Sequence, residues 1–487
     1  MSMSSTLPAP AAPETNTHSR YGKPGWWRWA VVLTPALAVA FLPIPEFTLA
    51  QRHLLAVFLA TIIGLIAQPV PMGVTVIVAM TILVLTGTLT PEAALSGFAE
   101  KTVWLIFAAF LFAQSVRVTG LGRRIAYAFI RQFGRSPLSL AYSVAASDVV
   151  LAPFVPSDTA RGGGVIFPIA RSLSQAFDSE PGPTARRMGS FLMLVAFHST
   201  YTASCMFLTG MIANPVIADF ARKIAHVELT WMTWFLGAIV PGLLTLTIMP
   251  YLLFRMHTPE ILDTAPAREF ANKELKQMGP LSHNEKLLLV VLLVVMGGWV
   301  SSPWHGIHNT FVALGGLSAL LLLRVLAWED LLAEKRAWDA LIWFAPLVMM
   351  SDQLNKTGTI KVISTAVFSH IVGWPWALAF IALMAAYFYA HYSFASMTAH
   401  ITALYPAFLT AALAATIHPM LAAMALAYLS NLHAGLTHYG TGSAPIYFGA
   451  GYVSQGEWWK LGFIIGLVNL VIWLGVGPLW WHALGLW

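Results

Sequence analysis

The sequence predicts an all-α polytopic membrane protein with about eleven transmembrane helices, two re-entrant hairpins and two inverted repeats. Hydrophobic residues make up 57% of the 487 residues and charged residues only 10%, and one short polar pattern occurs twice. A soluble domain of this composition would expose too much apolar surface, so the bilayer is its natural solvent. Apolar runs of ~20 residues, long enough to cross ~30 Å of hydrocarbon, recur along the chain. The predicted spans are 27–45, 52–69, 71–88, 102–119, 188–214, 228–254, 285–302, 308–327, 338–356, 416–452 and 459–483.

The repeated pattern reads Ser157-Asp158-Thr159-Ala160-Arg161 in one place and Ser396-Met397-Thr398-Ala399-His400 in the other, 239 residues later. Two further landmarks recur in the same order at shifts of 237 and 238 residues: Phe107-Ala108 with Phe344-Ala345, and Thr119-Gly120 with Thr357-Gly358. This order indicates a chain built from two related halves, each with a polar break at the same structural place. Such an arrangement is typical of transporters.

Basic residues predict a cytoplasmic N-terminus. Arg20, Lys23 and Arg28 flank the first span, and five arginines between positions 117 and 135 follow the fourth. Clusters of this kind mark the cytoplasmic side of a membrane protein. The uncharged, tryptophan-rich stretch after Lys460 predicts an outside C-terminus. An inside start and an outside finish require an odd number of spans.

The domain boundaries follow from composition and from the repeat. Each half then holds five spans and one hairpin, and because five is odd the second half enters the membrane inverted. The predicted parts are a disordered cytoplasmic tail 1–25, a first transmembrane span 26–50, a first inverted repeat 51–254 with hairpin 138–176, a cytoplasmic connector 255–284, and a second inverted repeat 285–487 with hairpin 374–412.

Each hairpin is interrupted at its copy of the motif. In the first, Pro153 and Pro156 end the incoming helix and a run of glycines, 162–164, follows. Backbone amides at membrane depth are tolerated only where protein or a water-filled cavity covers them. We therefore expect two re-entrant hairpins whose tips face one another near the protein centre.

The tips supply four hydroxyl groups, from Ser157, Thr159, Ser396 and Thr398. Hydroxyl donors and helix N-termini bind anions without carrying a full charge, which suits a carboxylate ligand. The alternative is that these hydroxyls bond their own backbone, as they commonly do in membrane helices. The duplication favours the binding role.

Two other apolar segments contain polar breaks. Residues 200–215 (TYTASCMFLTGMIANP) and 436–451 (LTHYGTGSAPIYFGAG) combine Gly, Thr and Pro. This mixture predicts discontinuous helices, with a kinked, closely packed helix as the alternative for each.

Three stretches resemble the divalent anion:sodium symporter family, in the branch of bacterial citrate, tartrate and succinate antiporters and plastid 2-oxoglutarate/malate translocators. They are PSDTARGGGVIFPI (156–169), FASMTAHITALYP (394–406) and NLHAGLTHYGTGSAPIYFGAGYV (431–453). The resemblance implies an elevator-type homodimer that exchanges di- or tricarboxylates of the malate, succinate, 2-oxoglutarate, citrate or tartrate type. It does not identify the preferred anion.

The resemblance also implies the binding residues. Ser157, Asp158, Thr159 and Ser396, Met397, Thr398 would hold the carboxylate substrate, and Thr209-Gly210 and Gly440-Thr441 would close the pocket. The family's usual Asn is replaced by Asp158 in one motif and Met397 in the other. Asp158 would repel a dianion unless Arg161 neutralises it or it is protonated at membrane depth, where burial favours a neutral carboxyl group.

Arg161 and His400 follow the two motifs at equivalent positions, near the cation sites of sodium-coupled relatives. We expect them to act as fixed, charge-compensating cations in place of sodium; a topology charge and a packed neutral imidazole are the alternatives. The other histidines, His391, His433 and His438, lack metal-site spacing. The expectation is therefore no metal and no cofactor.

Competing classes fit less well. A nucleic-acid partner is excluded because no basic segment carries a binding fold. An intramembrane enzyme could use His198, Ser199, His433 and His438, but no nucleophile elbow, paired His-Glu motif or acidic dyad supports it. A channel would need a continuous polar path instead of broken helices.

The expected partners are carboxylate anions, the lipid bilayer and a second copy of the chain. The expected location is the bacterial inner membrane, with a sodium- or proton-coupled symporter as the alternative function.

Overall fold

The computed structural model describes residues 25–42, 47–359, 362 and 374–487, and this part of the chain contains helices and no strand. Residues 1–24 of the predicted tail lie outside it. Up to the first repeated motif the helices are α1 (Trp26–Phe41), α2 (Leu49–Ala67), α3 (Met72–Leu85), α4 (Pro91–Leu95), η1 (Ser96–Ala99), α5 (Lys101–Thr119), α6 (Leu121–Phe133) and α7 (Pro137–Leu151).

From that motif to the connector the chain forms η2 (Thr159–Ile166), α8 (Phe167–Ala176), α9 (Gly189–Met206), α10 (Ala213–Phe220), η3 (Ala221–Ala225), α11 (Trp231–Met256) and α12 (Ala265–Met278). The following helices are α13 (His283–Val300), α14 (Ser302–His305), α15 (Asn309–Leu322), α16 (Trp328–Ala333) and α17 (Lys335–Lys356). The last group is α19 (Trp376–Ala390), η4 (His391–Ser393), α20 (Met397–Ala414), α21 (Pro419–Leu432), η5 (His433–Leu436), α22 (Ala444–Gly449), α23 (Gln455–Val471), η6 (Ile472–Val476) and α24 (Gly477–Ala483).

Six helical segments of the described chain are long and apolar enough to cross a membrane: Lys101–Thr119, Trp231–Met256, His283–Val300, Trp376–Ser393, Met397–Ala414 and Gln455–Ala483. Five shorter apolar helices accompany them. Two of the six segments, Trp376–Ser393 and Met397–Ala414, are the arms of the predicted second hairpin, so length alone does not separate a hairpin arm from a full span. The number of transmembrane helices therefore stays a prediction.

Large apolar side chains on several helices face outward, as lipid contact requires. Leu85 of α3 and Leu322 of α15 are 81% and 84% exposed, and Val294 of α13 is 68% exposed. Such surface would be costly in water and is favourable in hydrocarbon. The fold therefore agrees with a bilayer environment.

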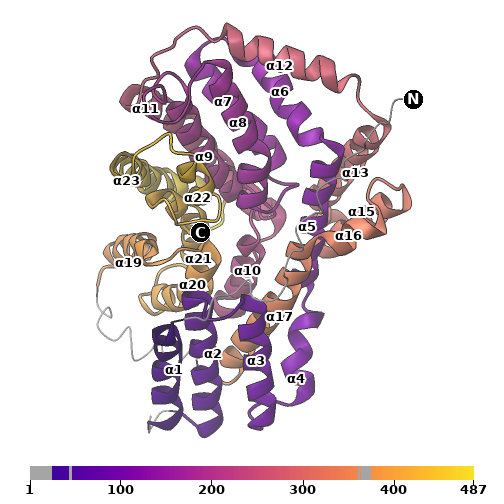
Figure 1. Cartoon of the computed structure of the whole chain (residues 1–487). Helices are drawn as coiled ribbons and strands as arrows, with labels where there is room; N and C mark the ends of the chain where they lie inside the picture. Colours follow the sequence, from indigo (N-terminus) through magenta and orange to yellow (C-terminus); the bar gives the residue numbers. More distant parts are fainter. Residues whose placement is uncertain (1–24, 43–46, 360–361, 363–373) are drawn as a thin grey trace, which may run out of the picture.

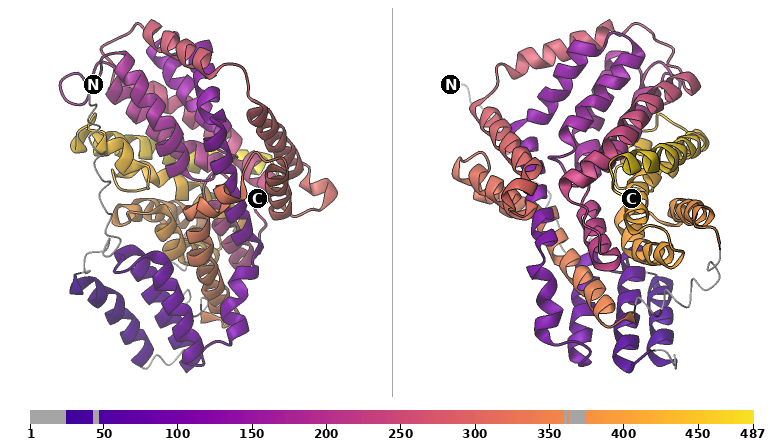
Figure 2. Two further views of the ribbon diagram at one scale, coloured as in Figure 1. Left: turned by 45° about the vertical axis from the view of Figure 1, so that its right-hand side comes forward. Right: turned by 180° about the vertical axis from the view of Figure 1, so that it is seen from behind.

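The core of the molecule is formed by α9 and α21. Every residue of α9 is buried, as is α21 from Leu421 to Leu432, and the two helices pack against each other and against α11. Figure 1 shows α1 to α4 at one end of an elongated chain and α6, α7 and α12 at the other, with α9, α10 and α21 between them. The views in Figure 2 show the same arrangement.

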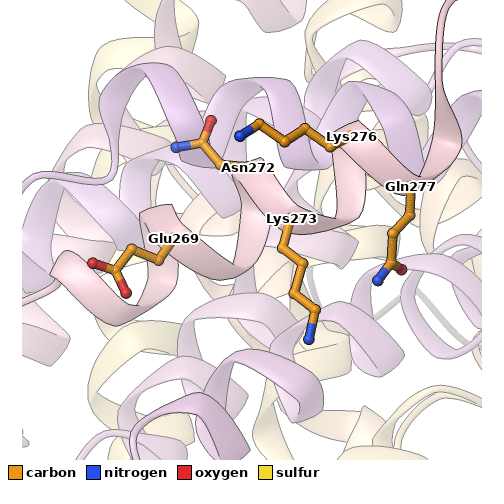
Figure 3. Close-up of a pocket in the computed structure, with 5 residues that line it drawn as sticks. All are labelled: Glu269, Asn272, Lys273, Lys276 and Gln277. Atoms are coloured by element: carbon orange, nitrogen blue, oxygen red, sulfur yellow. The ribbon is translucent and has the colours of Figure 1, made fainter.

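The predicted connector contains a helix. α12 packs along α6, and Arg124 of α6 holds the end of the connector: its Nε donates to Glu285 Oε1 at 2.7 Å and its Nη1 to the Gly279 carbonyl at 2.8 Å. The polar face of α12 borders an open hollow, shown in Figure 3, lined by Glu269, Asn272, Lys273, Lys276 and Gln277. No predicted binding residue lines this hollow.

Candidate functional site

The first repeated motif lies where one helix ends and the next begins. α7 ends at Leu151, residues 152–157 turn, and η2 follows with the wide turns of a π-helix. Ser157 Oγ accepts a hydrogen bond from the backbone N–H of Ala160 at 3.2 Å, as a capping side chain does. Its own hydroxyl proton has no acceptor among the residues that the structure describes.

The glycine run after this motif does not form the turn itself. Residues 162–164 lie inside η2, and the reversal of the chain is made by residues 152–157. Gly162 faces α9 so closely that a Cβ atom would lie 2.7 Å from Thr200 Cγ2. The missing side chain therefore serves close packing of η2 on α9.

The second motif has the same local geometry. α19 ends at Ala390, η4 follows, and α20 begins at Met397. Ser396 Oγ accepts from the backbone N–H of Ala399 at 3.3 Å. Ser157 and Ser396 thus cap their helices through the residue three positions on. Both serine oxygens thus accept from their own backbone, which is the alternative role considered for these hydroxyls. Within the described part of the chain their O–H groups have no acceptor and can donate to a ligand.

The second predicted break joins the first motif. α21 and η5 end at Leu436, and residues 437–443 separate them from α22. The Thr441 hydroxyl donates to Asp158 Oδ2, and Ser443 Oγ donates to the same oxygen at 3.1 Å. A Cβ atom on Gly442 would overlap Thr159 Oγ1, so the break packs directly against the motif.

The same break also contacts the second hairpin. The Gly440 carbonyl oxygen lies 2.8 Å from His391 Nε2, and the Tyr439 hydroxyl donates to the Tyr392 carbonyl at 2.9 Å. Residues 439–443 therefore lie between the two hairpins. The structure brings together Ser157, Asp158, Thr159, Gly440 and Thr441 across more than 280 residues of sequence.

The first predicted break interrupts α9 and α10 at residues 207–212. Thr209 Oγ1 donates to the Pro153 carbonyl at 2.8 Å, which attaches the break to the first hairpin. Asn214 Oδ1 accepts from Asn431 Nδ2 at 2.8 Å and so connects α10 to α21. Both segments named in the sequence are thus discontinuous helices, not kinked ones.

Ser396, Met397 and Thr398 lie apart from this hydrogen-bonded group. Within the described chain, no side-chain hydrogen bond joins them to the other predicted binding residues. Their helix, α20, packs against α10 and η3, which follow the first break. One contact of this packing is the stacking of Phe220, at the end of α10, on Tyr405 of α20.

Arg161 is placed differently from the expectation. Its guanidinium group is fully buried and pairs with Asp148 of α7, not with Asp158. Its Nη atoms donate to the carbonyls of Val155 at 2.7 Å and Gly210 at 3.1 Å, as well as to α9. Of the two alternatives for Asp158, neutralisation by Arg161 is therefore corrected, because Asp148 already balances the charge of Arg161. The pair holds η2, α7 and the first break together.

Asp158 has only hydroxyl partners in the described structure. It is 7% exposed and accepts from Thr441, Ser443 and, at 3.4 Å, Thr159. Three neutral donors can stabilise a carboxylate.

His400 lies in a cluster that the sequence analysis missed. It is fully buried, and its Nδ1 atom lies 3.3 Å from His391 Nδ1, while the ring of His433 is 4.4 Å from the His400 ring between centroids. Spacing along the sequence hid this cluster because the three histidines come from η4, α20 and η5.

Three other residues were missed. Asp148, Ser443 and His391 each contact a predicted site residue. Asp148 carried a signal in the sequence, since an acidic residue inside an apolar helix needs a partner. The other two carried none, because their roles depend on helices that meet only in the folded chain.

A cavity of about 710 Å³ borders the first break. Leu208 and Pro215, on either side of the break, line it together with Lys101, Asp219 and Arg222. None of the predicted binding residues lines this cavity. Each of the two tips by itself offers a capped helix N-terminus and a hydroxyl donor, which are groups that can bind an anion.

A family model described as the sodium:sulfate symporter transmembrane region matches residues 23–487. The putative malate transporter YflS of Bacillus subtilis is 47% identical over 459 residues, covering 94% of this chain and 96% of the relative. Dicarboxylate transporter 1 of Spinacia oleracea chloroplasts is 45% identical, covering 94% and 81%. The L-tartrate/succinate antiporter of Shigella sonnei is 33% identical, covering 93% and 98%.

Two solved structures share the fold. MtrF of Neisseria gonorrhoeae aligns with a TM-score of 0.55 at 14% identity, covering 92% of this chain and 97% of that one. YdaH of Alcanivorax borkumensis aligns with a TM-score of 0.55 at 15% identity, covering 94% and 97%. The chain is therefore a multi-pass membrane transporter, not an enzyme, and it belongs to the divalent anion:sodium symporter family.

Proposed function

We propose that this protein exchanges di- or tricarboxylate anions across the membrane. One observation carries the proposal: Ser157 and Ser396 cap two helices at the repeated motifs, and neither O–H donor has an acceptor among the described residues. Helix N-termini with hydroxyl donors suit a carboxylate. The relatives named for malate, dicarboxylate and tartrate/succinate transport support the substrate class.

The proposed binding residues are Ser157, Asp158 and Thr159 of the first tip, Ser396, Met397 and Thr398 of the second, and Thr209, Gly210, Gly440 and Thr441 of the two breaks. Contacts of the second break with both hairpins support a shared site. Met397 is buried and offers no polar group, so it would contribute packing to the carbon chain of the substrate.

The transport cycle that we propose is of the elevator type, in a homodimer built from two inverted repeats. The N-terminus would lie in the cytoplasm, with the protein in the bacterial inner membrane. The equivalent capping of the two motifs supports the repeats, and the clusters of arginine support the orientation.

Exchange is favoured over symport for a physical reason. Without a bound anion, the donors at the two tips have no acceptor, and carrying unsatisfied polar groups through a medium of low dielectric costs several kcal/mol. A bound carboxylate satisfies these donors. The empty carrier should therefore return slowly, and the antiporter among the relatives supports this choice.

Purified protein in liposomes tests the proposal. Vesicles loaded with a dicarboxylate should take up labelled external malate, succinate, 2-oxoglutarate, tartrate or citrate rapidly in potassium or choline buffer. Empty vesicles should take up little, with or without an inward sodium gradient or an inward proton gradient. Concentration of substrate into empty vesicles by sodium would establish the symporter instead, and concentration by protons would establish proton coupling through a group such as Asp158.

A further inference from the structure

Three buried histidines come together beneath the second hairpin tip. They are His391 of η4, His400 of α20 and His433 of η5, and all three side chains are 0% exposed. One ligand nitrogen from each lies within 4.8 Å of the others. They come from three separate elements, so the cluster exists only because the hairpin packs on the broken helix.

Several nitrogens of this cluster lack partners in the described part of the chain. His400 Nε2 and both ring nitrogens of His433 make no hydrogen bond. A buried imidazole N–H or lone pair without a partner is costly, and native proteins rarely leave one so. A bound ion would take the lone pair of one His433 nitrogen, so the unpaired ring of His433 is the observation in this set that points to a missing ligand.

His391 and His400 share a hydrogen bond between their Nδ1 atoms in this structure, and the separation of these atoms is also that of two ligands of one metal ion. His391 Nε2 lies 2.8 Å from the Gly440 carbonyl oxygen, and the carbonyl can only accept, so this nitrogen carries the proton. The lone pair of His391 is then on Nδ1, 3.3 Å from His400 Nδ1. Two imidazole nitrogens at ~2.0–2.1 Å from one tetrahedral ion lie about 3.3 Å apart, which matches this separation.

The third ligand comes from His433, whose ring stacks on His391 with centroids 3.7 Å apart. A stacked ring does not aim its lone pair at the same point as its neighbour, so His433 must turn about its Cβ–Cγ bond to join the pair. This turn breaks no hydrogen bond, because neither nitrogen has a partner in the described structure.

We propose that His391, His400 and His433 bind one divalent ion of the zinc type. Neutral imidazole nitrogens are preferred ligands of such ions, whereas the hard cations Na⁺, Mg²⁺ and Ca²⁺ prefer oxygen. The contact of His391 with Gly440 fixes the tautomer, as outer partners of metal-bound histidines do.

The test uses the full chain, purified in detergent without a histidine tag and treated with a chelator. Zinc chloride should bind at one ion per chain in titration calorimetry. Cobalt chloride should give the intense visible absorption of a tetrahedral ion, and zinc should remove it. His400→Gln and His433→Gln should each weaken zinc binding by about 100-fold or more, since even outer partners of metal ligands are worth ~10–100-fold. His418→Gln, an exposed histidine of the same half, is the matched control and should leave binding unchanged.

Wild-type protein that binds no zinc at this stoichiometry, or variants that bind as tightly as His418→Gln, would overturn the proposal. If both variants fail to fold, X-ray absorption of the cobalt-loaded wild type decides it: three imidazole ligands support the site, and fewer than three refute it. These measurements involve no transport, so their outcome is separate from that of the exchange experiment.

Discussion

Replacing Arg161 tests whether this residue is a structural cation. Arg161→Met leaves Asp148, which is 0% exposed, without its ion-pair partner. Breaking a buried pair from one side costs ~3–5 kcal/mol, because the remaining charge stays buried and uncompensated. The change also removes the donor that the Gly210 carbonyl has at 3.1 Å, whereas the carbonyls of Val155 and Thr200 keep the Ser157 N–H and the Ser204 hydroxyl as donors. We expect a total loss of at least about 5 kcal/mol.

The assay is the free energy of unfolding in mild detergent micelles titrated with dodecyl sulfate. Arg171→Met removes an exposed arginine from the neighbouring helix α8 and is the matched control, with an expected change below about 0.5 kcal/mol. The double change Arg161→Met with Asp148→Leu should recover at least ~2 kcal/mol of the loss, because no unpaired carboxylate remains.

Two results would refute this reasoning. If Arg161→Met is as stable as Arg171→Met, the buried pair does not hold the hairpin to the first break. If the single variant is stable but exchange no longer needs internal substrate, Arg161 is the fixed counter-cation that the sequence suggested, and the pairing with Asp148 is not its main role.

The remaining predictions concern Ser157 and Asp158 of the first tip and Thr398 of the second tip. Ser157→Ala or Thr398→Ala should weaken the apparent affinity for dicarboxylate roughly ten- to hundred-fold, because each variant loses one hydrogen bond to a charged group worth ~1.5–3 kcal/mol. Inhibition of exchange by unlabelled substrate measures this affinity. Unchanged affinity in both folded variants would remove Ser157 and Thr398 from the proposed site. If the Asp158 carboxylate is only tolerated in the site, Asp158→Asn should keep exchange and flatten a steep pH profile of transport. If Asp158 carries protons, the same change should abolish proton-driven uptake. A variant with wild-type affinity, rate and pH profile would show that Asp158 does not face the substrate.

Much of the local architecture could be predicted from the sequence, because its causes are local. The apolar composition of the chain predicts a membrane environment. Pro153 and Pro156 follow the end of α7 and oppose its continuation, since proline lacks an amide donor. The Thr- and Gly-containing breaks at 207–212 and 437–443 interrupt helices for similarly local reasons. Capping by Ser157 and Ser396 also needs only three neighbouring residues. The family followed from short motifs of the same kind.

Pairing of side chains was decided by the tertiary structure. Arg161 had two acidic candidates, and helix packing aims it at Asp148, 13 residues back, not at the nearer Asp158. Asp158 instead receives hydroxyl donors from more than 280 residues away. His391 and His400 are separated by nine residues and His433 by many more, so no spacing rule could have joined them. Such contacts depend on how α9, α20 and α21 pack, and packing is a property of the whole chain.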